Sequence, residues 1–211
     1  MRKITVLSIL LIFTAAVSSV FAQGTSTSIQ LGWFSPQATE TGFIIGLGQS
    51  KVFDEKVELG ISLDFFNNKY TDEKTVAVDT TGTGTNINTR QASLETNTMM
   101  FPLMANLTIK IPVVFPLEPY ISGSLGYVLL WDNYKNYEDN VEETKFFSGF
   151  AWRASAGLAY QLGSRSDITA EVMYIGAKPS RSEGEENGLP TWTEVDMSGL
   201  AFRLGVRLYV F

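Results

Sequence analysis

Apolar and polar residues alternate with a period of two along most of the chain. The odd positions from Val57 to Phe65 share one apolar face, and so do the even positions from Leu200 to Val210. Because successive side chains of a β-strand point to opposite faces, this alternation predicts strands with one apolar face each. Eight such runs are recognisable, at approximately 26–34, 42–53, 56–69, 93–111, 118–133, 146–162, 167–178 and 197–211.

One apolar face per strand fits two architectures. A soluble β-sandwich turns that face inward, whereas a membrane barrel turns it outward, toward lipid. The opposite face is mostly Gly, Ala and Ser with a few charges, which suits the crowded interior of a narrow barrel better than a water-facing sheet. Several runs reach 14 residues or more, while globular strands usually have about 5–6 residues and a tilted membrane strand needs about 9–11.

The connectors between these runs alternate in length. The long ones are 35–41, 70–92, 134–145 and 179–196, and the short ones are 54–55, 112–117 and 163–166. Short turns on one rim and long loops on the other are typical of outer-membrane barrels, which place both chain ends on the periplasmic, short-turn rim. We therefore predict an all-β, eight-stranded, antiparallel up-and-down transmembrane β-barrel, monomeric and located in the bacterial outer membrane.

The first 22 residues are predicted to be a signal peptide, which leaves 23–211 as the barrel domain. Arg2 and Lys3 precede a ten-residue apolar run, and a small, polar segment then leads to Ala22. This is the three-part layout of a secretory signal. The apolar run is shorter than the roughly 20 residues that span a bilayer, which disfavours the alternative of a retained anchor.

The composition excludes several kinds of chemistry. The chain has no cysteine and no histidine, which removes disulfides, thiolate and Ser-His-Asp catalysis, and every histidine-ligated metal site. Two acidic residues share a strand face, but Glu58 and Asp64 are six positions apart, roughly 20 Å along a strand, and cannot act as a pair. We expect no enzymatic activity and no cofactor. Without the leader, 14 basic and 22 acidic residues remain, so nucleic acid is a poor candidate partner.

The predicted strands contain sequences that resemble a known family. The stretch 119–127, PYISGSLGY, and the preceding 101–107, FPLMANL, resemble strands of the small outer-membrane β-barrel proteins of the OmpX, OmpW and OmpA-transmembrane-domain type. With the signal peptide and the final Phe211, the resemblance covers about 26–211. It implies insertion by the outer-membrane assembly machinery, which reads a last strand that ends in an aromatic residue. It implies a barrel and no particular activity.

The last strand departs from the family pattern. Its apolar set lies at even positions, whereas Phe211 falls on the odd set. Either a bulge shifts the register near Tyr209, or the terminal aromatic is an imperfect assembly signal.

Parity places a balanced set of charges inside the predicted barrel. The set has three acids and three arginines: Glu58, Asp64, Arg153, Glu171, Arg203 and Arg207. We expect Glu171 to lie level with Arg207, and Arg153 to lie on its other neighbouring strand. A gated proton or ion path is one reading. A structural ion network is the other, and it is favoured because eight strands enclose little more than side chains and buried charges must be paired.

The long connectors carry the negative charge. They contain 13 acidic and five basic residues, clustered in 138–143 and 183–186. They are predicted to form a solvated cell-surface face. Two more specific hypotheses are capture of a divalent cation that bridges to lipopolysaccharide, and contact with an unknown extracellular ligand through Tyr134, Tyr137 and Trp192.

The sequence therefore predicts a structural and surface-interaction role rather than a large open pore. Transport of a small solute or a hydrophobic ligand, as in OmpW, is the alternative. In that case apolar side chains should gather inside the barrel near the loop rim, where Phe66, Val128 and Leu130 give a hint of such a group. A lipid-modifying enzyme is the least favoured class.

Overall fold

The computed structural model describes residues 24–54, 56–81, 85–113, 116–136, 141–186 and 189–210. The strands are β1 (Thr25–Pro36), β2 (Gly42–Asp54), β3 (Val57–Thr81), β4 (Thr85–Lys110), β5 (Leu117–Asn136), β6 (Val141–Gly163), β7 (Ser166–Ala177), β8 (Ser180–Glu186), β9 (Leu189–Glu194) and β10 (Gly199–Val210). Within these ranges no helix is long and apolar enough to cross a membrane. The predicted signal peptide lies outside the described residues.

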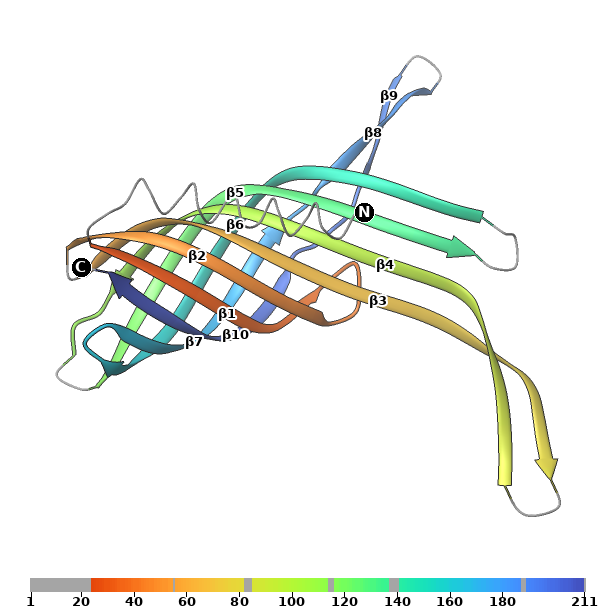
Figure 1. Ribbon diagram of the computed structural model, residues 1–211. Helices are drawn as coiled ribbons and strands as arrows, with labels where there is room; N and C mark the ends of the chain where they lie inside the picture. The colour runs from red at the N-terminus through yellow and green to blue at the C-terminus, as the bar shows by residue number, and fades with distance from the viewer. Residues whose placement is uncertain are drawn as a thin grey trace.

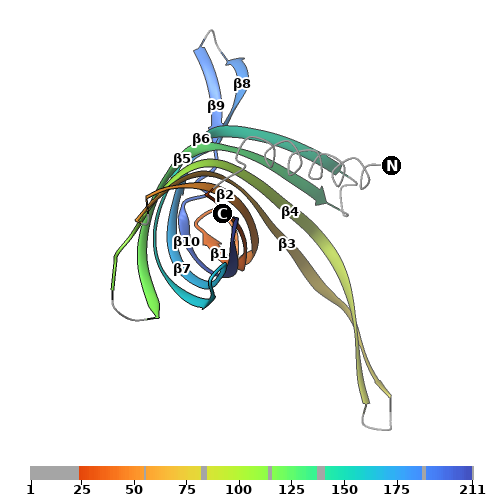
Figure 2. The same cartoon turned by 60° about the vertical axis from the view of Figure 1, so that its left-hand side comes forward.

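Eight of the strands close into a barrel. The order β5-β4-β3-β2-β1-β10-β7-β6 is completed by pairing of β5 with β6, and every pairing is antiparallel. The ring of strands is visible in Figure 2. Both ends of the barrel chain meet on one rim, because Thr25 pairs with Val210. The prediction of an eight-stranded up-and-down barrel is confirmed.

The apolar face of each strand points outward. Leu125, Phe150 and Leu200 are 61%, 62% and 60% exposed, and their neighbours in sequence point inward. An outer surface of this kind is unstable in water and favourable against acyl chains. The soluble sandwich, which would bury these residues, is therefore excluded.

Aromatic side chains form a band on this outer surface. The rings of Phe65, Phe101, Trp131 and Phe146 follow one another across β3, β4, β5 and β6, with centroids 5.0, 5.5 and 5.0 Å apart. A second pair of rings, Trp152 on β6 and Tyr174 on β7, has centroids 5.6 Å apart on the same outer surface. Aromatic rings favour the boundary between hydrocarbon and headgroups, so the band indicates where the bilayer ends on the loop side.

The long connectors hold more strand than the sequence pattern predicts. Residues 70–92 were expected to be a loop, but β3 and β4 continue through them as a hairpin with breaks in register between Asp72 and Glu73 and between Thr75 and Ala77. In Figure 1 this hairpin bends away from the barrel wall. The connector 134–145 likewise extends β5 and β6. The prediction missed these segments because a strand beyond the membrane has no apolar face to alternate.

A separate hairpin fills part of the last long connector. β8 and β9 pair with each other, and Ser180 of β8 pairs with Ser148 of β6. Figures 1 and 2 show this hairpin rising clear of the barrel. Three hairpins, β3–β4, β5–β6 and β8–β9, therefore project from the loop rim.

The register of the last strand is regular over its described length. β10 pairs with β1 without interruption from Gly199 to Val210. The hypothesis of a bulge near Tyr209 is therefore wrong for this segment, while Phe211 lies outside the described residues.

Candidate functional site in the barrel lumen

The structure places all six of the charged side chains singled out by parity inside the barrel. Their exposure ranges from 0% for Asp64 to 6% for Arg207. They come from four strands, β3, β6, β7 and β10. Each occupies an inward position, since every second residue of a strand points inward. They divide into two groups along the barrel axis, one near its middle and one near the rim of short turns.

The first group, the central network, consists of Asp64, Arg153, Glu171 and Arg203. Asp64 accepts hydrogen bonds from Arg153 Nη1 at 2.6 Å and from Arg203 Nη1 at 2.7 Å. Arg203 Nη2 also donates to Glu171 Oε1 at 2.5 Å. Charges therefore alternate along the chain Arg153, Asp64, Arg203, Glu171, which is how buried ions offset their cost of desolvation.

Neutral side chains complete the central network. Arg153 Nη2 donates to Ser62 Oγ at 2.9 Å and to Asn106 Oδ1 at 2.7 Å. The Tyr120 hydroxyl donates to Glu171 Oε2 at 3.2 Å, and its ring lies over Gly157, its partner across strands β5 and β6. The network is thus fixed from β3, β4, β5, β6, β7 and β10.

Gly46 gives the central network its room. A Cβ atom at this position would collide with Asp64 Oδ1 and Arg203 Nη1. We expect Gly46→Ala to lower the free energy of unfolding by about 1–3 kcal/mol, because overpacking displaces the ion pairs. Gly123→Ala is the matched control, since its Cβ would meet nothing within 4 Å. Urea unfolding in lipid vesicles measures both, and equal effects of the two substitutions would contradict this role of Gly46.

The second group, the turn-side cluster, consists of Glu58, Lys110, Asp167, Arg207 and Tyr209. Glu58 Oε1 lies 2.8 Å from Lys110 Nζ and 3.8 Å from Arg207 Nη1. The Tyr209 hydroxyl accepts from Lys110 at 2.9 Å and donates to Asp167 Oδ2 at 2.8 Å. These contacts cross the lumen from β3 and β4 to β7 and β10.

The structure corrects the expected pairing of Glu171 with Arg207. In the register of β10 and β7, Glu171 faces Arg203, whereas Arg207 faces Asp167. Arg153 does lie on β6, the other neighbour of β7. Sequence reasoning also missed Lys110, Asp167 and Tyr209, although each has the inward parity of its strand and could have been found by that rule.

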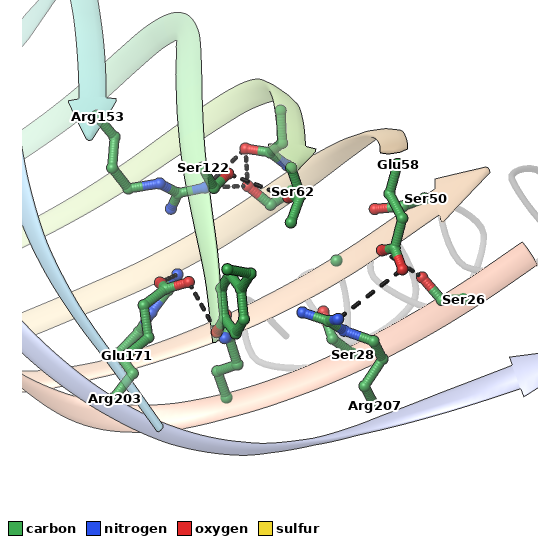
Figure 3. A pocket seen from close by; sticks show the side chains of 15 residues that line it. Ser26, Ser28, Ser50, Glu58, Ser62, Ser122, Arg153, Glu171, Arg203 and Arg207 are labelled. Carbon is green, nitrogen blue, oxygen red and sulfur yellow. Dashed lines mark hydrogen bonds and ion pairs between the residues drawn. The ribbon is translucent and has the colours of Figure 1, made fainter. Parts of the chain in front are cut away.

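A polar chamber of about 50 Å³ lies between the two groups. Its lining includes Glu58 and Arg207 from the turn-side cluster, Arg203 and Glu171 from the central network, and the hydroxyl-bearing Ser28. Figure 3 shows the two groups on opposite sides of it. On the turn rim, a wider depression of about 420 Å³ is lined by Lys110, Asp167 and Tyr209 among others. The turn-side cluster therefore separates the depression from the chamber.

On the loop side of the central network the lumen is filled by apolar residues, which we call the apolar septum. They are Phe34, Ile44, Phe66, Met100, Met104, Val128, Leu130, Phe147, Ala151, Met173, Ile175, Ala177, Met197 and Ala201. None is more than 4% exposed, and Phe34 meets Phe66 edge to face at 5.1 Å. The expectation of a lumen lined mostly by small residues is correct only for its turn-ward half.

The segment 195–198 continues the wall beside the septum. Met197 N–H donates to Ala177 O at 2.9 Å, and Gln37 N–H donates to Ser198 O at 2.9 Å. Asp196 accepts from the Ser198 N–H at 3.0 Å, and hydrogen bonds from Ser198 lower the pKa of the Asp196 carboxyl. The wall therefore remains closed above β10, and Met197 is held in the septum.

Along the barrel axis, the lumen alternates between open spaces and levels filled by side chains. From the turn rim these are the depression, the turn-side cluster, the chamber, the central network and the septum. Ion pairs fix the strands against one another, and the septum excludes water. Such an arrangement can stiffen the barrel and hold a few small polar species in its turn-ward half.

Comparison with solved structures identifies the fold. The chain is similar to Neisserial surface protein A, with a TM-score of 0.57, 12% identity, and coverage of 89% of this chain and 98% of that one. It is also similar to OprG from Pseudomonas aeruginosa, with a TM-score of 0.58, 12% identity and coverage of 90% and 97%. It is similar as well to a major outer membrane protein from Thermus thermophilus, with a TM-score of 0.54, 14% identity, and coverage of 88% of this chain and 99% of that one. No protein-family model matches the sequence, and no curated protein matches it.

These likenesses show a shared fold. The chain has the architecture of the small outer-membrane β-barrels, and its apolar belt and aromatic band place it in the bacterial outer membrane.

Proposed function

We propose that this outer-membrane barrel acts through its surface, as a closed and rigid platform that holds projecting hairpins outside the cell. The observation that carries the proposal is the closed lumen. Ion pairs cross it at two levels, and the septum fills it on the loop side. We propose no enzymatic activity and no cofactor.

The charge of the projecting hairpins supports binding of a cationic partner. Five cations of the loop side lie within 4 Å of a carboxylate: Lys69 with Glu95, Lys135 with Glu142, Lys145 with Glu143, Lys178 with Asp196, and Arg181 with Glu183. The acids outnumber the bases there, so the net charge offered to a partner is negative. Trp192 on β9 is 65% exposed and could add an aromatic contact.

The closed lumen predicts near-background conductance. In planar lipid bilayers we expect neither the natural chain nor Arg207→Ala to produce stable current steps. The septum lies on the loop side of the central network, does not include Arg207, and would still close the lumen after the substitution. Arg207→Ala should nevertheless destabilise the barrel. Large, reproducible steps from either protein would overturn the platform proposal.

Binding through the hairpins is tested with a defined probe. We expect a fluorescent decalysine peptide to bind the protein in nanodiscs of uncharged lipid, and to bind the variant Glu142→Gln/Glu143→Gln/Glu183→Gln more weakly. Asp54→Asn, on the turn rim, is the control. Equal binding by both variants would exclude the hairpins as the binding surface.

A hydrophobic-ligand transporter is the second candidate, and the septum is the observation in its favour. The apolar side chains inside the barrel near the loop rim are far more numerous than the sequence hint indicates. Their packing opposes it, since a transport site needs a lined cavity and the space beside Leu130 and Met197 measures about 100 Å³, well below ordinary ligand pockets of about 300–1,000 Å³.

A further inference from the structure

We propose that the polar chamber is a binding site for a small monovalent anion of halide size. The site lies between the two ionic groups, and its ligands would be Arg207, Arg203 and the hydroxyl groups of Ser28 and Ser50. A distinct set of observations supports it, independent of what the hairpins bind.

The first observation is that Arg207 lacks a close carboxylate partner. Its nearest carboxylate oxygen, Glu58 Oε1, is 3.8 Å away, beyond hydrogen-bond distance. Its one hydrogen bond to a side chain of the described residues goes from Nη1 to the Tyr209 hydroxyl at 3.3 Å. The guanidinium also lies 5.1 Å from the centre of the Tyr120 ring. A guanidinium with five donors, on a residue only 6% exposed, therefore makes one hydrogen bond to a side chain of the described residues.

The second observation is that both nearby carboxylates have other partners, although Glu58 Oε1 is in an ion pair without accepting a hydrogen bond. Glu58 forms its short ion pair with Lys110 and accepts from the Ser26 hydroxyl at 3.2 Å. Glu171 is held by Arg203 and by Tyr120. The charged residues that line the chamber are three arginines and two glutamates. Asp64, which pairs with Arg153 and Arg203, balances the total charge, so Arg207 is the lining cation without a carboxylate within hydrogen-bond distance.

The third observation is that further side chains with donor groups line the same space. Arg203 Nε is buried and has no hydrogen-bond partner, although the rest of that guanidinium is paired. Ser28 lies opposite Arg207 in the register of β1 and β10, and Ser28 and Ser50 both line the chamber. Figure 3 shows Ser28 beside Arg207 and Ser50 beside Glu58. An unpaired buried donor is costly, and a bound anion would satisfy several donors at once.

The fourth observation is that the space fits a small anion. Gly48 lines the chamber, and a Cβ atom there would approach Ser28 Oγ closely, so the missing side chain leaves room. A volume of about 50 Å³ holds a few waters or one small anion. Large organic anions are excluded by size. The septum closes the loop side, so an anion would enter from the turn rim, past Lys110 and Tyr209.

Bromide is the probe for this site, because it scatters X-rays anomalously and mimics chloride in size. We expect crystals soaked in sodium bromide to show an anomalous peak within hydrogen-bond distance of Arg207. In detergent solution, the temperature at which the barrel unfolds should rise by about 3–5 °C for each tenfold increase in bromide above the dissociation constant. Sodium gluconate at equal ionic strength should give no such rise.

Three variants separate a bound anion from trapped water. Ser28→Val removes one donor and fills part of the chamber while leaving every charge in place, so it should abolish both the peak and the bromide dependence. Arg207→Met should do the same. Ser35→Ala, on the same strand but facing outward, should keep both. If Arg207→Met fails to fold, Ser28→Val decides alone. Water without bromide in the chamber, or bromide dependence that persists in Ser28→Val, would overturn the proposal.

Discussion

Replacing Asp64 with asparagine is expected to lower the free energy of unfolding by about 3–5 kcal/mol. Asp64 is 0% exposed and binds two arginines at 2.6 and 2.7 Å. The amide of asparagine keeps the size of the side chain but removes the charge that both guanidinium groups share. Arg203 would then keep only the carboxylate of Glu171, and Arg153 would lose its carboxylate partner. Urea unfolding in lipid vesicles, followed by the fluorescence of the four tryptophans, measures the loss.

A surface ion pair provides the control for Asp64→Asn. Glu143 and Lys145 are 3.4 Å apart, with side chains 51% and 41% exposed. Exposed pairs contribute roughly 0–1 kcal/mol, so Glu143→Gln should leave stability almost unchanged. If Asp64→Asn were equally mild, the central network would be a by-product of packing and not a determinant of stability.

Leu204→Arg is expected to cost about 2–4 kcal/mol, which is the usual penalty for arginine on the lipid face near the bilayer midplane. Leu204 lies in the middle of β10, points outward and is 48% exposed. Leu208→Arg, on the same face but near the turn rim, should cost roughly 0–1 kcal/mol, because the guanidinium can reach the headgroups there. Unfolding measurements in vesicles compare the two directly.

The depth dependence is the informative result. A water-facing strand would tolerate arginine at both positions. Equal and small effects of Leu204→Arg and Leu208→Arg would therefore contradict the membrane orientation of the barrel. Equal and large effects would indicate that the hydrocarbon core extends further toward the turn rim.

The membrane-spanning part of the fold could be predicted because lipid enforces a strict rule on alternate residues. Leu200 to Val210 face acyl chains at every second position, and this period fixes both the strand and its orientation. No such rule acts beyond the bilayer. The outer parts of β3 and β4 and the β8–β9 hairpin have no apolar face, so their strands depend on pairing alone and left no periodic signal.

The sequence predicts which residues point into the lumen, but it does not predict which of them contact one another. Parity found Glu58, Asp64 and Arg203, because inward positions follow from the strand period. It could not pair them, since the contacts depend on how far each strand is shifted against the next. Arg203 meets Asp64, which lies three strands away around the ring, through side chains that cross the lumen. The septum was underestimated for the same reason, because Phe34 and Phe66 become neighbours only in the closed barrel.

The central network has a consequence for assembly. Its acids and arginines lie on β3, β6, β7 and β10, so it is complete only when the last strand has joined the first. A partly inserted sheet would expose these ions to hydrocarbon without partners, at high free energy. Partly closed intermediates inside the bilayer are therefore disfavoured. The buried ions couple insertion to closure, so the sheet must close into a barrel before or during its transfer from water into the membrane.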